Sequence, residues 1–161
     1  MNNIEIGIPS SIDGSRIADI SKSIGIFTPE DIKCIQELWH EFLVESSDQD
    51  RYYFLYAKIN GIIQGFICYG HRPLTTGTYD IYWLAVHSTQ QKKGVGKMLL
   101  SSAEKQIKIL GGYQVLIETS GLNIFSNTRE FYLSSGYSLT ATIADFYDDN
   151  DALNIFIKRI N

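Results

Sequence analysis

The sequence predicts an α/β fold of the α+β type, built on a mixed, mostly antiparallel sheet with helices on both faces. A strand-like run over residues 78–86, a helix-like run over residues 95–110 and an apolar strand over residues 113–119 follow one another. Such a unit forms a right-handed crossover that pairs two parallel strands. Strand pairs joined by turns flank the unit on both sides and should be antiparallel. A central parallel pair should therefore lie among antiparallel neighbours.

The composition suits one domain over residues 1–161, because 44% of the residues are hydrophobic and 20% are charged. No apolar run approaches the roughly 20 residues that span a bilayer, and the N-terminus lacks the pattern of a signal peptide, so we expect a cytoplasmic protein that does not bind membranes. The net charge of −4 argues against nucleic-acid binding and suits either a cationic substrate or plain solubility. Cys34 and Cys68 are expected to be reduced core residues, without the spacing of metal ligands.

The N-terminal part should contain a strand followed by two helices. Residues 4–8 alternate as in a short strand, and residues 10–24 carry isoleucines at helical spacing. Thr28 and Pro29 form a strong helix start, with a capping hydroxyl before a proline at the first helical position. That second helix should end near Ser46.

A β-hairpin should follow these helices. Residues 52–59 and 62–69 are rich in aromatic and β-branched side chains, and Asn60-Gly61 between them is a strong signal for a tight turn. Gly65 interrupts the returning strand, which indicates a bulge or a close contact of the backbone.

The C-terminal part continues from the central helix, which Gly111-Gly112 should stop. After the apolar strand, residues 126–135 should form a short helix that Gly136 ends. Residues 137–144 and 153–158 are expected to be the last two strands, separated by an acidic loop over residues 145–151.

The turn between the strand at 78–86 and the central helix has the features of an anion site. Gly94 and Gly96 let the backbone approach a ligand closely. The first turn of the helix offers unpaired N–H groups at the positive end of the helix dipole, and three lysines lie in or beside the turn. These features suit a phosphate or pyrophosphate.

Two common phosphate motifs do not fit this turn. A P-loop needs glycine at position 91 and serine or threonine at position 98, where this chain has Gln91 and Met98. A dinucleotide motif needs glycine at position 99, which is Leu99.

Three segments together resemble the GNAT superfamily of N-acyltransferases. Gln91-x-x-Gly94-x-Gly96 resembles its acyl-CoA pyrophosphate signature, the run from Tyr82 to Val86 resembles its central strand, and the run from Phe131 to Tyr137 resembles its Phe-Tyr-x-x-x-Gly-Phe segment. The similarity covers about residues 50–145, in the family's order and spacing. It implies the GNAT fold, whose sheet matches the mixed sheet predicted above. It also implies transfer of an acetyl group from the cosubstrate acetyl-CoA to a primary amine.

The chain departs from the family pattern before the motif tyrosine. Many members carry Asn seven residues and Ala four residues before it, where this chain has Phe125 and Thr128. Asn123 and Asn127 are nearby but out of register. Thr128 either takes over a polar contact or caps the short helix.

The resemblance assigns acetyl-CoA binding to the end of the central strand, the glycine turn and the short helix. The residues are Leu84, Ala85, Val86, Gln91, Lys92, Lys93, Gly94, Val95, Gly96, Lys97, Thr128 and Phe131. Backbone N–H groups of the first three could polarise the thioester carbonyl, although all could be ordinary sheet donors. The lysines could equally be solvated surface charges.

Two residues are the candidates for proton transfer. Tyr132 occupies the family's general-acid position and would protonate the leaving thiolate, unless it is simply an aromatic core residue. Glu118, in an otherwise apolar strand, is the candidate base, with Asp80, Tyr82 and His87 as rivals and ordered water as an alternative.

The acceptor amine is the least determined part of the hypothesis. Candidate residues come from the second helix, the strand after it and the last hairpin: Trp39, Phe42, Glu45, Tyr52, Phe146, Tyr147, Asp148 and Asp149. They suit a small cationic amine, a protein N-terminus or a lysine side chain, so the partner is a small-molecule or a protein amine. A homodimer paired through the C-terminal strands is one option. The alternative function is a non-catalytic acyl-CoA-binding or regulatory module.

Overall fold

The computed structural model describes residues 3–44 and 51–161 of the chain. The elements, in chain order, are β1 (Ile4–Gly7), α1 (Gly14–Ser23), α2 (Pro29–Leu43), β2 (Tyr52–Ile59), β3 (Ile62–His71), β4 (Thr78–Val86), α3 (Val95–Ile109), β5 (Gln114–Ser120), α4 (Ser126–Ser134), β6 (Ser138–Asp148) and β7 (Asp151–Arg159). This order confirms the predicted succession of strands and helices. No helix within these residues is long and apolar enough to cross a membrane.

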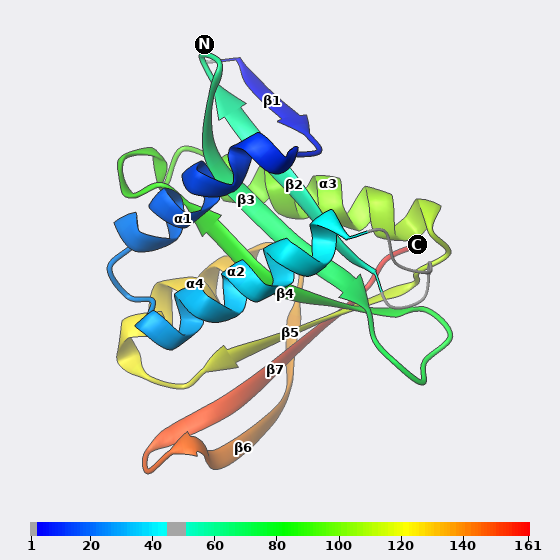
Figure 1. Cartoon of the computed structure of the whole chain (residues 1–161). Coiled ribbons are helices and arrows are strands. Elements are labelled where there is room, and N and C mark those ends of the chain that lie inside the picture. The colour runs from blue at the N-terminus through cyan, green and yellow to red at the C-terminus, as the bar shows by residue number, and fades with distance from the viewer. Residues whose placement is uncertain (1–2, 45–50) are drawn as a thin grey trace.

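One sheet joins all seven strands in the order β1-β2-β3-β4-β5-β7-β6. Within the described residues the β4–β5 pair is the only parallel one, and the other neighbours are antiparallel. Helices α1 and α2 cover one face of the sheet and α3 covers the other, as Figure 1 shows. The predicted mixed sheet, with its central parallel pair and helices on both faces, is therefore confirmed.

Local sequence signals explain several boundaries. Asn60 and Gly61 both have positive φ, at 53° and 78°, as a two-residue turn that follows the twist of its strands requires. A Cβ at Gly65 would lie 3.0 Å from the carbonyl oxygen of Ala85, beside a shift in the β2–β3 register, which confirms the expected close contact and bulge. Thr28 caps α2 by accepting a hydrogen bond from the Asp31 N–H at 3.1 Å.

The last hairpin corrects the sequence prediction. The expected acidic loop over residues 145–151 is wrong, because β6 runs to Asp148, β7 begins at Asp151, and these two residues pair. Asp145 has a positive φ of 52° within an irregular part of the register, and its carboxylate accepts the Asn150 N–H at 2.8 Å. A bulge and a tight turn therefore replace the loop.

Two smaller expectations also change. Helix α2 ends at Leu43, where Val44 forms its C-cap, and the predicted end near Ser46 lies outside the described residues. Cys34 is exposed on α2, so its expected core position is wrong, whereas Cys68 is buried. Both cysteines are free thiols.

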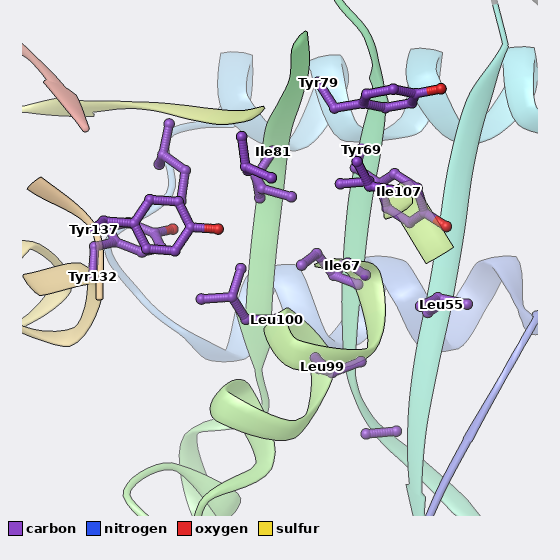
Figure 2. Packing of buried hydrophobic residues seen from close by; sticks show 14 of the residues in the cluster. Leu55, Ile67, Tyr69, Tyr79, Ile81, Leu99, Leu100, Ile107, Tyr132 and Tyr137 are labelled. Carbon is purple, nitrogen blue, oxygen red and sulfur yellow. The ribbon is translucent and has the colours of Figure 1, made fainter. Parts of the chain in front are cut away.

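A layer of buried side chains lies on each face of the sheet. One layer lies between α3 and the sheet and contains Ile117 together with Leu99, Leu100, Ile81 and Tyr132, which Figure 2 labels. The other lies beneath α1 and α2 and is built around Phe54, Phe66 and Ile35. The two layers hold the sheet rigid on both faces, and the central strands carry the candidate site between them.

Replacing Leu99 with alanine should lower the free energy of unfolding by about 2–5 kcal/mol, because it removes a fully buried side chain between α3 and the sheet. Urea denaturation measures this loss. Met98→Ala is the matched control, since Met98 is 40% exposed on the same helix and should change stability by no more than about 0.5 kcal/mol. Equal losses in the two variants would contradict the described packing of α3.

Candidate active site

The two parallel strands separate halfway along their length. Strands β4 and β5 pair from Thr78 with Gln114 to Ile81 with Ile117 and no further. Beyond that point β4 stays paired with β3 up to Val86, and β5 stays paired with β7 up to Ser120. The C-terminal halves of β4 and β5 therefore diverge, as their arrows in Figure 1 show.

A cleft of about 810 Å³ opens where the strands diverge. Its walls come from the ends of β4 and β5, the glycine turn before α3, helix α4 and the segment between α1 and α2. The predicted cofactor residues that line it are Leu84, Val86, Gln91, Lys92, Gly94, Gly96, Lys97, Thr128 and Phe131. Both proposed proton-transfer residues, Tyr132 and Glu118, line it as well.

The backbone N–H groups at the end of β4 alternate between β3 and the cleft. His87 donates its N–H to the carbonyl oxygen of Gln64 in the β3 direction, at 2.7 Å. Successive N–H groups along a strand point to opposite edges, so those of Val86 and Leu84 point away from β3 and into the gap. Ala85 directs its N–H to β3 and its side chain is only 2% exposed. The structure thus places Leu84 and Val86 at the cleft and Ala85 in the sheet.

The glycine turn presents unpaired amides to the cleft. Gly94 is the N-cap of α3 with a left-handed φ of 83°, and no side chain caps the helix. The first helical hydrogen bond runs from Met98 N–H to Gly94 O at 3.1 Å. The N–H groups of Val95, Gly96 and Lys97 are therefore left for a ligand at the positive end of the helix dipole. This cradle fits a pyrophosphate.

The three lysines of the turn do not share one role. Lys92 and Lys97 line the cleft. Lys93 instead donates to the Thr89 carbonyl oxygen at 2.8 Å and to the Gln90 side chain at 3.2 Å, so it ties the turn together on its outer side. Gln91 also holds the turn in place, since its side-chain amide donates to the Val86 carbonyl oxygen at 3.1 Å.

Helix α4 and the turn before it close the cleft opposite the glycine turn. Thr128 and Phe131 face the cleft, and so do Phe125 and the out-of-register Asn127. The Phe131 ring lies close to the turn, because a Cβ built on Gly96 would meet it at 3.6 Å. That distance is ordinary van der Waals contact, so the ring and the turn form one continuous wall.

Tyr132 is buried in the wall of the cleft on the α3 side of the sheet. Its ring contacts those of Phe131, Tyr137 and Phe156, with centroids 5.3, 6.0 and 6.0 Å away. Figure 2 shows Tyr132 and Tyr137 together at the edge of this layer. Burial raises the pKa of the Tyr132 phenol above its ordinary value of 10.0, so the group stays protonated at neutral pH.

Glu118 lies on the opposite face of the sheet from Tyr132. Its side chain is 41% exposed, and its Oε1 is 3.5 Å from Nη1 of Arg72. The same Nη1 donates to Oδ1 of Asp80 at 2.7 Å. Arg72 was not identified as a site residue from the sequence. It follows β3 in a turn and belongs to none of the motifs found in the sequence. The tertiary structure alone brings it to Glu118.

The rival bases have other partners. Asp80 is only 7% exposed, and burial raises the pKa of its carboxyl while the hydrogen bond from Arg72 offsets part of that rise. The Tyr82 ring packs on that of Tyr52, with centroids 5.4 Å apart. His87 places its Nδ1 2.9 Å from Oγ1 of Thr89, at the start of the glycine turn. Of these rivals only Tyr82 lines the cleft, as Glu118 does.

The structure divides the predicted acceptor residues into three groups. Trp39 and Phe42 are partly buried, each has its ring 5.2 Å from that of Phe54, and neither is among the residues that line the cleft. Tyr52 packs on the Tyr82 ring at 5.4 Å, near the cleft. Glu45 lies outside the described residues. The remaining candidates lie on the exposed hairpin of β6 and β7: Phe146, Tyr147, Asp148 and Asp149.

Tyr147 connects the hairpin to this side of the cleft. Burial, followed by the nearby charges of Glu118 and Asp151, raises the pKa of its phenol. Asp151 itself accepts a hydrogen bond from the Ser120 hydroxyl at 2.5 Å. The face that carries Glu118 is therefore acidic and aromatic, which suits a cation. Within residues 3–44 and 51–161, no cluster of three potential metal ligands is present.

The comparisons with known proteins give a consistent result. The profile of the acetyltransferase (GNAT) family matches residues 21–137. A GNAT-family acetyltransferase structure from Desulfovibrio desulfuricans is 32% identical, with a TM-score of 0.93 over 99% of this chain and 100% of that chain. A comparison with curated proteins gives no match.

Two more distant structures share the fold. An aminoglycoside 6'-N-acetyltransferase in complex with coenzyme A is 14% identical, with a TM-score of 0.75 over 98% of this chain and 97% of that chain. The ribosomal-protein-S18-alanine N-acetyltransferase from Escherichia coli is 17% identical, with a TM-score of 0.78 over 99% and 95% of the two chains. With the family profile and the 32% identical relative, the fold and the divided parallel pair lead to one conclusion: this chain belongs to the acetyltransferase (GNAT) family.

Proposed function

We propose that the protein transfers an acetyl group from acetyl-CoA to a primary amine. The observation that carries the proposal is the end of the β4–β5 ladder at Ile81 and Ile117, because it opens a cleft that reaches from the glycine turn to Glu118. The unpaired amides of the turn, with Lys92 and Lys97, would hold the pyrophosphate. The N–H groups of Leu84 and Val86 would donate hydrogen bonds to the extended arm of the donor. The arm would take the place of a neighbouring strand along this edge of β4.

The chemistry requires one bond to form and one to break. The amine nitrogen attacks the thioester carbonyl carbon, the C–N bond forms, and the C–S bond then breaks to leave a thiolate. A backbone N–H of β4 would stabilise the developing oxyanion. Glu118 would accept the proton that the amine loses, directly or through water, and Tyr132 would donate a proton to the thiolate.

The proposal for the two reactants draws on the charges and on the relatives. A relative of the same fold was solved with coenzyme A, which agrees with a pyrophosphate at the glycine turn. The named acceptors of the relatives are an aminoglycoside in one case and an alanine of a ribosomal protein in the other. The acidic, aromatic face around Glu118 supports an amine that is cationic before it reacts.

A panel of amines tests the proposed function directly. Thiol release from acetyl-CoA would be measured with polyamines, aminoglycosides, amino acids and peptides, and the acetylated product would be identified by mass spectrometry. Release with at least one class supports the transferase. Tight coenzyme A binding without release for any amine would instead favour the non-catalytic acyl-CoA-binding module. A rise in melting temperature with ATP but not with coenzyme A would contradict both.

Replacing Tyr132 with Phe should lower kcat by about 10²–10⁴-fold and leave coenzyme A binding nearly unchanged, because it removes the proton donor and keeps the ring. Thiol release and calorimetry measure the two quantities. Because burial raises the Tyr132 pKa above 10.0, the wild-type rate should not decline through loss of this proton below about pH 10.

Tyr113→Phe is the control for this substitution, since Tyr113 packs on Arg159 at the other end of β5 and should tolerate the loss of its hydroxyl. Unaltered turnover in Tyr132→Phe would remove this residue from the proposed mechanism.

Replacing Gly94 with Glu should weaken coenzyme A binding by about tenfold or more, equivalent to at least about 1.4 kcal/mol. The new carboxylate would lie beside the unpaired amides that the pyrophosphate needs. Gly94→Asn is the matched control, because asparagine tolerates the left-handed φ of 83° and adds no charge. Calorimetric titration with coenzyme A compares the two variants, and equal affinities would show that the anion binds elsewhere.

A further inference from the structure

Arg72 connects two carboxylates that come from the two diverging strands. It directly follows β3, and its Nη1 lies 2.7 Å from Oδ1 of Asp80 on β4 and 3.5 Å from Oε1 of Glu118 on β5. The Asp80 and Arg72 side chains are therefore placed where the β4–β5 ladder still exists, whereas Glu118 lies just beyond its end. One guanidinium spans the point at which the strands part.

The backbone of Arg72 is fixed by the turn in which it lies. Its N–H donates to the Thr78 carbonyl oxygen at 2.8 Å, and its own carbonyl oxygen accepts the Thr75 hydroxyl at 2.8 Å. The Thr75 hydroxyl oxygen in turn accepts the Thr78 N–H at 3.3 Å. These hydrogen bonds fix the backbone from which the Arg72 side chain extends. The side chain therefore starts from one defined position on its way to the two carboxylates.

Asp80 fixes the other end of the Arg72 side chain. It lies on β4 and is only 7% exposed. A buried carboxylate needs a paired cation, which makes the 2.7 Å contact with Arg72 the firm one of the two. Glu118 is the more exposed of the two carboxylates, since its side chain is 41% exposed and that of Asp80 is 10% exposed.

We propose that Arg72, anchored by Asp80, is a positioning residue that holds the carboxylate of Glu118 at the acceptor end of the cleft. This inference rests on the proposed function of Glu118 as the proton acceptor. Arg72 lies 3.5 Å from Oε1 of Glu118, so Oε2 would be the oxygen that accepts the proton of the amine. A shift of about 1 Å in a reacting group can cost about 100-fold in rate. By holding the Glu118 carboxylate in place, Arg72 contributes to catalysis without touching the substrate itself.

If Arg72 had only a structural role, its replacement would change the stability of the protein more than the rate of the reaction. The Arg72–Glu118 pair has both side chains 41% exposed, and exposed ion pairs contribute about 0–1 kcal/mol to stability. Its effect should therefore appear in the reaction with the amine and be absent from coenzyme A binding. The carboxylates also outnumber the guanidinium here, so the end of the cleft stays acidic and still favours a cationic acceptor.

A double-mutant cycle tests the proposal. The kcat/KM for the best amine of the panel, the Kd for coenzyme A and the melting temperature would be measured for wild type, Arg72→Gln, Glu118→Gln and the double variant. We expect Arg72→Gln to lower kcat/KM for the amine by up to about fivefold, the factor that corresponds to the upper limit of about 1 kcal/mol for such a pair, with an unchanged coenzyme A Kd. In the Glu118→Gln background the same substitution should have no further effect, because its target is gone.

Two further variants cover loss of folding and loss of charge. Arg72→Gln leaves Asp80 buried without a partner, so Arg72→Gln with Asp80→Asn removes both charges and should show the same kinetic loss. Arg72→Lys should recover part of the rate, because it keeps the charge beside Asp80. Arg159→Gln is the control, since Arg159 is exposed and packs on Tyr113 away from the cleft. If Glu118→Gln turns over too slowly, calorimetry of the amine with the coenzyme A-bound protein gives the same cycle.

The outcomes separate this inference from the proposed function. Equal losses from Arg72→Gln in both backgrounds, or no loss in the wild-type background while Glu118→Gln is impaired, would overturn the positioning role alone. Full activity of Glu118→Gln would overturn its role as proton acceptor and the inference with it. Absence of thiol release by the wild type with every amine would overturn the proposed function itself.

Discussion

The early end of the β4–β5 ladder is the constraint on which the candidate site depends. Each strand keeps its antiparallel partner beyond Ile81 and Ile117, so β4 diverges with β3, β5 diverges with β7, and the facing edges of β4 and β5 are left without each other as partners. The bulge at Tyr82 adds local twist to β4 at the same level. The result is that the N–H groups of Leu84 and Val86 face the cleft without a partner in the sheet. A ligand that supplies acceptors along this edge would pair with these N–H groups.

Local signals in the sequence predicted the fold and the glycine turn before α3 well, because glycine turns, helix caps and alternation act over a few residues. The bulge at Tyr82 could not be predicted, and it sets which N–H groups face the cleft, so Ala85 could not be told from its neighbours. Trp39 and Phe42 were assigned to a pocket from their aromatic character, although their helical spacing places them against the core. Arg72 could not be found, because only the folded sheet joins it to Glu118.

The cysteines and lysines show the same limit in a different form. Composition placed Cys34 in the core, but the side of a helix that a residue occupies depends on how the helix packs, and Cys34 is exposed. Lys93 and Lys97 lie in one turn, yet only Lys97 lines the cleft, because Lys93 is bound by the carbonyl oxygen of Thr89. The lysines of a motif therefore predict that the ligand is an anion. Which of those lysines can reach the ligand depends on the hydrogen bonds that each one makes in the folded protein.

The sheet separates the two charges that the proposed reaction must bring together. The positive end of α3 and Lys92 lie at one end of the cleft, while Asp80 and Glu118 project from the face that α1 and α2 cover. An anionic donor and a cationic acceptor would each meet a complementary surface, and the gap between β4 and β5 is where they could touch. Tyr132, buried on the α3 side and kept protonated by that burial, faces this gap opposite the carboxylate. In the proposed reaction, Glu118 would accept a proton on one face of the sheet and Tyr132 would donate one from the other.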